Sequence, residues 1–146
     1  MKIVIDTNVL MSALYSKKGA SYRLLRWLIK RYTQNIKVNV VSVTLVLEYE
    51  DVLTREKNLK MFSPLSKTDI VKFIDSICML SYHQEINFLW RPYLKDAKDD
   101  MVLEVAFNGN CDYIITHNIK DFKGIEKFNI EAITPKEFLK IVGESK

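Results

Sequence analysis

The chain opens with Met1-Lys-Ile-Val-Ile-Asp-Thr-Asn-Val-Leu10, and this segment indicates the class of fold. Its apolar run, Ile3-Val4-Ile5, is typical of a central parallel strand that is buried on both faces. Polar residues follow at once, and Asp6 and Asn8 stand where the strand would end. Because open α/β sheets bind their ligands beyond the carboxyl ends of parallel strands, we expect a functional site here.

Strands and helices are predicted to alternate along the rest of the chain. Further strands are expected at residues 38–41, 85–89, 113–116 and 130–133. Helices are expected at 9–15, 20–32, about 42–54, 66–79, about 101–108 and from 134 onward. This alternation predicts a single α/β domain, residues 1–146, with a central parallel sheet of about four to five strands flanked by helices.

The composition fits one globular domain with a basic surface. The chain has 146 residues, of which 48% are hydrophobic and 27% are charged, and its formal net charge is +4. Since that sum includes acids that we place in a pocket, the remaining surface is more basic than the total indicates. Such a surface suits a polyanion, although many proteins with this charge balance bind none.

Cysteine usage and hydropathy predict a cytoplasmic protein. Cys78 and Cys111 follow no metal-binding spacing, so we expect two reduced and buried side chains. The chain opens directly into a strand and has no apolar run long enough to span a membrane. We therefore expect neither a signal peptide nor a membrane partner.

Four acidic residues are predicted to meet at the carboxyl ends of the strands: Asp6, Glu48, Asp96 and Asp99. Gathered carboxylates raise one another's pKa unless a hard cation joins them. An all-oxygen ligand set favours Mg²⁺ or Mn²⁺ over Zn²⁺ or copper. These residues therefore indicate metal-assisted phosphodiester chemistry.

The first two acids also have structural interpretations. Asp6 could simply cap the helix that follows it. Glu48 could be an exposed residue on an amphipathic helix, where glutamate is common. That second interpretation fits its neighbours Glu50 and Asp51 better than it fits Glu48, which follows three apolar residues.

Three acids crowd the start of one predicted helix: Asp96, Asp99 and Asp100. The helix dipole favours an acid there by about 0.3–1 kcal/mol, which explains any one of them. It does not explain three within five residues, because their mutual repulsion grows with their number. Glu104 lies one turn after Asp100 and could face either the pocket or solvent.

Polar residues also follow the strand predicted at 113–116. Asn118 can orient a carboxylate without adding charge, and Asp121 could be a turn residue. No rival catalytic set is visible, since His83 and His117 fall in no metal-ligand spacing. The chain also lacks a nucleophile elbow and a glycine-rich phosphate loop.

At these residues the chain resembles a PIN-domain ribonuclease, of the branch of small prokaryotic proteins that are toxin components of toxin–antitoxin pairs. The motifs that carry the resemblance are, in order, Asp6-Thr7-Asn8, Ser42 with Leu47-Glu48-Tyr49-Glu50-Asp51-Val52-Leu53, Asp96-Ala97-Lys98-Asp99-Asp100, Tyr113-Ile114-Ile115-Thr116-His117-Asn118 and Lys120-Asp121-Phe122. Each motif is weak alone, but five in order at the family's spacings are specific. The resemblance covers nearly the whole chain and implies a PIN-like (Rossmann-like) fold with an acidic pocket at the carboxyl edge of its sheet.

The resemblance also implies roles for particular residues. Three of them match the family's core metal-binding acids: Asp6, Glu48 and Asp99. Further candidate ligands are Asp96, Asp100 and Asp121, and the polar residues that would orient the acids are Asn8, Thr116 and Asn118. Many relatives have a fourth aspartate where this chain has Asn118, which weakens the case for a second metal ion.

The activity that the resemblance implies is Mg²⁺- or Mn²⁺-dependent endoribonuclease cleavage, leaving a 3′-hydroxyl and a 5′-phosphate. Single-stranded or looped RNA is the expected substrate, because its bases are accessible. Candidate phosphate contacts are Lys17, Lys18, Arg23, Arg26 and Lys98, which a solvated basic helix face explains equally well. The expected partners are an antitoxin protein over the acidic pocket and a second copy of the chain in a homodimer.

Three other functions stay open. One is a non-catalytic PIN-type protein that binds or scaffolds RNA, and another is an RNA-processing nuclease without an antitoxin. The third is a phospho-acceptor signalling domain, which is also α/β with acids at strand ends. That domain needs an acidic pair after the first strand and an acceptor aspartate after a middle strand, whereas here the second strand ends in Ser42.

Overall fold

The structure, a computed structural model, describes residues 1–144 and contains a parallel β-sheet with helices on both sides. The strands β1 (Ile3–Ile5), β4 (Tyr113–Ile115) and β5 (Glu131–Ile133) pair in the order β1-β4-β5. The strands β2 (Val40–Val41) and β3 (Tyr82–His83) form a second parallel pair. One parallel bridge between Ile3 and Asn39 joins the two, which gives the spatial order β3-β2-β1-β4-β5. The α/β fold with a parallel sheet is confirmed.

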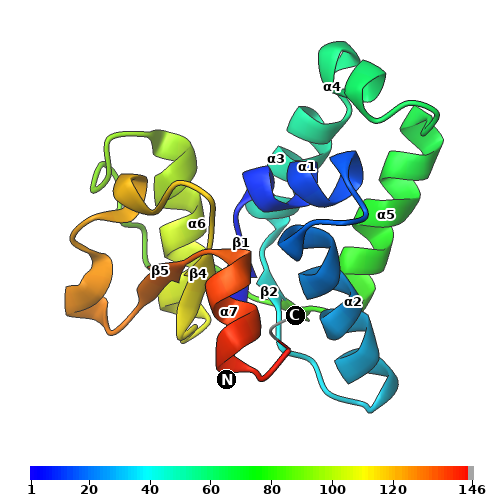
Figure 1. The fold of residues 1–146 in the computed structure, drawn as a ribbon. Coiled ribbons are helices and arrows are strands. Elements are labelled where there is room, and N and C mark those ends of the chain that lie inside the picture. Colours follow the sequence, from blue (N-terminus) through cyan, green and yellow to red (C-terminus); the bar gives the residue numbers. More distant parts are fainter. Residues whose placement is uncertain (145–146) are drawn as a thin grey trace.

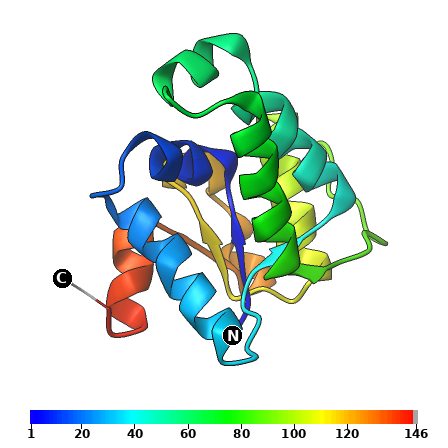
Figure 2. The ribbon, with the colours of Figure 1, turned by 90° about the vertical axis from the view of Figure 1, so that its right-hand side faces the viewer.

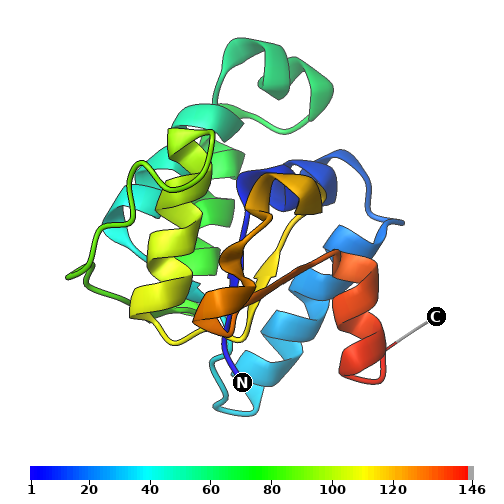
Figure 3. The same cartoon turned by 90° about the vertical axis from the view of Figure 1, so that its left-hand side faces the viewer.

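Seven α-helices and two short 3₁₀ helices connect the strands of residues 1–144. The α-helices are α1 (Thr7–Tyr15), α2 (Ala20–Thr33), α3 (Val43–Leu53), α4 (Glu56–Met61), α5 (Lys67–Met79), α6 (Ala97–Asn108) and α7 (Pro135–Ile141), and the 3₁₀ helices are η1 (Ile119–Phe122) and η2 (Ile125–Phe128). In Figure 1 and Figure 3, α3, α5 and α6 cover one face of the sheet, and α2 and α7 cover the other. Figure 2 shows α4 at one end of the molecule, beyond the sheet.

Local sequence explains where several helices begin. The hydroxyl of Ser42 accepts a hydrogen bond from the backbone N–H of Leu45 at the start of α3. Ser66 and Thr134 each form a full capping box with an acid three residues later, as their sequences predict. These caps satisfy backbone donors that have no partner inside the helix.

The core packs around β1, whose three residues are fully buried. Tyr49 on α3 is also fully buried, and its hydroxyl donates to the backbone carbonyl of Ile5. This hydrogen bond attaches α3 to the end of β1, so the helix that carries Glu48 is held against the strand that leads into Asp6.

The strand predicted at residues 85–89 is wrong. The third strand is β3, three residues earlier, and 85–89 form an irregular segment in which Phe88 and Leu89 are 62% and 63% exposed. Its backbone N–H groups bond to the side chain of Asn108 instead of to a neighbouring strand. The sequence also gave no expectation of α4 or of the two 3₁₀ helices.

Within residues 1–144, every helix is too short or too polar to cross a lipid bilayer.

Candidate functional site

Asp6 lies where β1 ends and α1 begins, and it is 9% exposed. Its carboxylate accepts hydrogen bonds from the hydroxyl of Thr116 (2.8 Å), the backbone N–H of Thr7 (2.9 Å) and the side-chain amide of Asn8 (3.1 Å). Burial raises the pKa of Asp6 above its ordinary value, although these three hydrogen bonds act in the opposite direction. Asp6 therefore caps the helix and also presents a fixed, buried carboxylate.

Asn8 and Thr116 hold Asp6 from two different elements. Besides its bond to Asp6, the Asn8 side chain accepts from the backbone N–H of His117 at 3.2 Å. The hydroxyl of Thr116 accepts from the backbone N–H of Asn118 at 3.0 Å while donating to Asp6. Residues after β4 and residues after β1 thus form one hydrogen-bonded network at the carboxyl edge of the sheet.

Asp99, in the first turn of α6, has a pKa raised to about 7. Burial is the main cause, and the negative charges of nearby acids add to it: Asp6, Asp121, Asp96 and Asp100. Two carboxylates from other elements therefore lie close enough to affect Asp99, as the sequence predicts for Asp6. In Figure 3, the start of α6, the start of α1 and η1 share one end of the molecule.

Glu48 is partly buried on α3, with a side chain that is 15% exposed. Its Oε1 atom has no hydrogen-bond partner among the described residues, and the Lys98 ammonium approaches it only to 3.7 Å. The alternative of an exposed surface glutamate is therefore wrong for Glu48. It holds for the neighbours, since Glu50 is exposed and Asp51 pairs with Arg55 one turn away at 2.8 Å.

Two acids at the start of α6 have structural partners. Asp96 is the N-cap, and its side chain accepts from the backbone N–H of Lys98 at 2.9 Å. Asp100 is 1% exposed, and it accepts from the backbone N–H groups of Leu94 (2.7 Å) and Tyr93 (3.3 Å). We therefore assign Asp100 to the preceding loop rather than to a metal ion.

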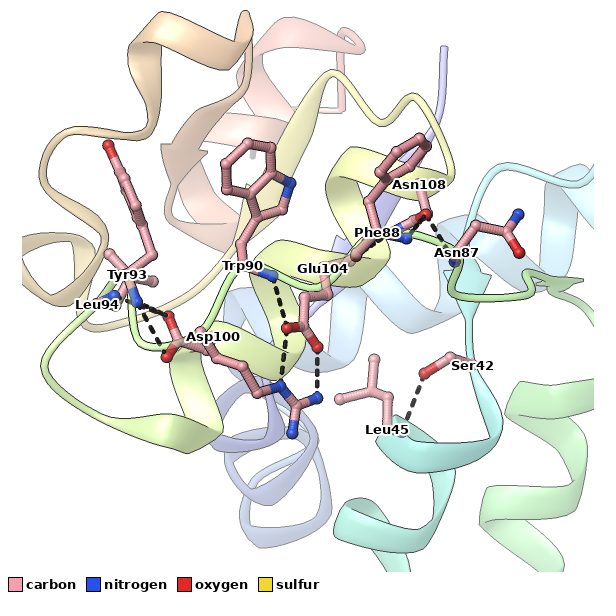
Figure 4. Close-up of polar contacts among 11 residues, drawn as sticks. Ser42, Leu45, Asn87, Phe88, Trp90, Tyr93, Leu94, Asp100, Glu104 and Asn108 are labelled. Atoms are coloured by element: carbon pink, nitrogen blue, oxygen red, sulfur yellow. Dashed lines mark hydrogen bonds and ion pairs between the residues drawn. The ribbon is translucent and has the colours of Figure 1, made fainter.

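Asp100 is the first of three polar side chains on one face of α6 that bind the loop at residues 87–94, and we call them the α6 ladder: Asp100, Glu104 and Asn108 (Figure 4). Glu104 accepts from the backbone N–H of Trp90 (2.9 Å) and from two nitrogens of the Arg91 guanidinium (2.9 and 2.6 Å). Asn108 accepts from the backbone N–H groups of Asn87 and Phe88, both at 3.0 Å. The ladder fixes this loop along the helix.

Glu104 faces neither the pocket nor solvent, the two positions that the sequence left open. Its side chain is 2% exposed and points to the 87–94 loop. The signal that could have revealed this is the spacing of Asp100, Glu104 and Asn108 at every fourth residue, which places them on one helix face.

A cavity of about 460 Å³ lies beside Asp99. Acids and lysines line it together: Asp96, Asp99, Asp121, Lys95, Lys120 and Lys123. The end of the 87–94 loop contributes one wall, and η1 contributes another. The acids of this cavity were predicted from the sequence as site residues and the lysines were not, although each of Lys95 and Lys120 directly precedes a candidate acid.

Four of the five basic residues that the sequence proposed lie at or just before α2, whereas Lys98 is exposed in the first turn of α6. Lys17, Lys18 and Arg26 are exposed, and Arg23 is half-buried. A contact between the Ser21 hydroxyl and the His117 ring (3.1 Å) joins the start of α2 to the end of β4. This places the start of α2 next to the acidic end of the sheet, and RNA contact there remains a prediction.

Within residues 1–144, no three His, Cys, Asp or Glu side chains stand close enough to hold one metal ion. The chemistry of Asp6, Glu48 and Asp99 nevertheless fits a hard divalent cation. All three offer oxygen, Glu48 has a buried oxygen without a hydrogen bond, and Asp99 is disfavoured as an anion by its acidic neighbours. A cation would relieve both costs.

Comparison with known proteins gives the family. The sequence profile of the PIN domain matches residues 2–120, which include Asp6, Glu48, Asp96, Asp99, Asp100 and Glu104 and end one residue before Asp121. The chain therefore belongs to the PIN domain family, whose members are generally nucleases. No curated protein matches the chain.

The raised pKa of Asp99 predicts how the metal-free protein responds to pH. The folded chain keeps the Asp99 proton up to about pH 7, whereas the unfolded chain loses it near pH 4. The folded state therefore binds more protons between these values, and this residue makes stability fall as the pH rises. We expect Asp99→Asn to raise the melting temperature in EDTA at pH 7–8 and to have little effect near pH 4.

Thermal unfolding of both proteins in EDTA from pH 4 to pH 8 measures this difference, and Asp75→Asn, at an exposed acid on α5, is the control. A melting-temperature difference that stays constant with pH would contradict the assignment. Adding Mg²⁺ is expected to stabilise the unmodified protein more than Asp99→Asn.

The ion pair of the α6 ladder predicts an asymmetric mutational response. Arg91→Ala leaves the buried Glu104 charge with only the Trp90 N–H, so we expect a loss of about 3 kcal/mol. Glu104→Gln removes the buried charge itself and leaves Arg91, which is 46% exposed, to be hydrated. We expect that loss to be about 1 kcal/mol.

Urea unfolding at pH 7 measures both changes. Arg55→Ala, which breaks an exposed pair with Asp51, is the control and is expected to cost no more than about 0.5 kcal/mol. Equal losses for Arg91→Ala and Arg55→Ala would show that Glu104 does not depend on its partner.

Proposed function

We propose that the protein is a metal-dependent endoribonuclease that hydrolyses RNA phosphodiester bonds, with Asp6, Glu48 and Asp99 holding Mg²⁺ or Mn²⁺. The observation that carries the proposal is the placement of Asp99 in a PIN domain. It is partly buried, and Asp6 and Asp121 from two other elements lie close enough for their charges to add to burial in raising its pKa. A carboxylate that is costly to ionise in the free protein becomes favourable when a divalent cation binds it.

The side chains around the site would act by position and charge. Thr116 and Asn8 fix one oxygen of Asp6 and leave the carboxylate little freedom to turn. Glu48 would exchange its 3.7 Å contact with Lys98 for the ion, and Asp99 would give up its proton. A bound Mg²⁺ or Mn²⁺ supplies Lewis acidity, which lowers the pKa of water and neutralises charge on the phosphate.

Asp121 supplies a nearby negative charge that Asn118, at the position of the family's fourth aspartate, does not supply. Asn118 occupies the position at which many relatives have a fourth aspartate, and it brings no charge. Asp121, three residues later on η1, lines the cavity and raises the pKa of both Asp99 and Asp6. We propose that Asp121 takes over the electrostatic part of that fourth acid.

The narrower assignments are part of the same proposal. As a toxin of a type II toxin–antitoxin pair, the protein would have its acidic pocket covered by an antitoxin, and it would form a homodimer. A phospho-acceptor domain is disfavoured, because Ser42 at the end of β2 is used as the N-cap of α3.

The deciding experiment uses end-labelled single-stranded RNA with Mg²⁺, Mn²⁺ or EDTA. We expect cleavage with either ion and none in EDTA. Glu48→Gln and the double variant Asp6→Asn, Asp99→Asn are expected to lose more than the 10–100-fold that is typical of a residue beyond the ligands. Glu50→Gln, an exposed neighbour on α3, is the matched control and is expected to retain activity.

Absence of cleavage, together with absence of metal binding by calorimetry, would favour a non-catalytic RNA-binding PIN domain. Equal activities of Glu48→Gln and Glu50→Gln would contradict the assignment of Glu48 as a residue that holds the metal ion.

A further inference from the structure

Three lysines line the acidic cavity without pairing to its acids. Lys95 lies at the end of the 87–94 loop, and Lys120 and Lys123 lie at η1. Among residues 1–144, no carboxylate approaches any of the three within ion-pair distance, although three acids line the same cavity. Their charges are therefore available to an anionic ligand.

The two walls that carry these lysines are attached to each other and to α6. The Tyr93 hydroxyl donates to the backbone carbonyl of Gly124 at 3.1 Å, which joins the loop to the segment after η1. Asp100 holds the backbone N–H groups of Tyr93 and Leu94, directly before Lys95 (Figure 4). Because these contacts fix the backbone, the lysines start from set positions around the cavity.

Two kinds of charge line this one cavity. Asp99 and Asp121 lie where a cation is favoured, and the lysines lie where a phosphate is favoured. A chain with regularly spaced phosphates satisfies both, since one phosphate can meet the cation while its neighbours meet lysines. Lys127, whose ammonium lies 4.7 Å from the Tyr93 ring centroid, adds positive charge beside this wall.

We propose that Lys95, Lys120 and Lys123 form the phosphate-binding wall of the site and grip the RNA backbone next to the bond that is cut. The inference rests on the proposed ribonuclease function, and it adds substrate contact on the side of η1 to the contacts that the sequence suggested at α2 and at Lys98. The wall contacts phosphates, so it binds RNA without regard to base sequence.

The test measures binding without metal or cleavage. Fluorescence anisotropy with a 5′-labelled 12-nucleotide oligouridylate in EDTA gives Kd at KCl concentrations from 50 to 200 mM. The slope of log K against log salt is negative, and each lost phosphate contact to a single strand reduces its magnitude by about 0.7. The triple variant Lys95→Gln, Lys120→Gln, Lys123→Gln should therefore reduce that magnitude by about 2.

The matched control removes the same charge elsewhere. Lys57, Lys60 and Lys67 are exposed on α4 and at the start of α5, and none of them lines the cavity, so their triple glutamine variant should keep the original slope. Circular dichroism melting of both variants verifies folding. Equal slopes for the two triple variants, or no RNA binding by the unmodified protein at 50 mM KCl, would overturn the proposal.

Cleavage with Mg²⁺ or Mn²⁺ on the same three proteins separates this inference from the proposed function. Metal-dependent cleavage together with an unchanged salt slope in the cavity triple variant would support the nuclease function and contradict phosphate binding by the three lysines. The lysines would then be available to an acidic protein segment. A salt slope of reduced magnitude in the cavity triple variant, with no cleavage by any of the three proteins, would support phosphate binding by these lysines and contradict the nuclease function.

Discussion

The buried carboxylate of Asp6 is the group on which the arrangement of the site depends. It joins three elements, because it ends β1, caps α1 and accepts a hydrogen bond from Thr116 after β4. A buried carboxylate is tolerated only when its oxygens have partners, and here three donors supply them. The same contacts orient it toward the acidic end of the sheet, so stability and position come from one set of hydrogen bonds.

The acids around Asp99 lower the stability of the free protein at neutral pH. Burial and, to a smaller extent, the charges of these acids raise the pKa of Asp99 to about 7, which means that the free protein is less stable when Asp99 is ionised. A cluster of this kind is costly for a fold and useful for holding a cation. Conflicts of this kind are expected at functional sites rather than in the core.

Helix α6 contributes to the candidate site in two ways, by supplying an acid to it and by holding the loop beside it. Its first turn supplies Asp99, and Asp100, Glu104 and Asn108 along another face supply the α6 ladder that holds the 87–94 loop. The loop in turn ends at Lys95, beside the cavity. An apolar helix face would leave the backbone N–H groups of the loop without acceptors. The polar side chains of the α6 ladder accept these hydrogen bonds, as the carbonyl groups of a neighbouring strand would in a sheet.

The sequence by itself determined the elements whose signals are local. The apolar run of β1, the polar residues after it and the capping boxes at Ser66 and Thr134 all predicted what the structure contains. The prediction of a strand at 85–89 failed, because Phe88 and Leu89 favour a strand, while the acceptor for the Phe88 backbone N–H is the side chain of Asn108, on a helix 20 residues later. The same distinction holds for the candidate site. Asp6 and Asp99 could be predicted because they are acids at the ends of elements. The partners of Glu104 and the unpaired lysines of the cavity could not be predicted. Only the tertiary structure decided those, because a side chain's partner depends on which distant backbone lies beside it.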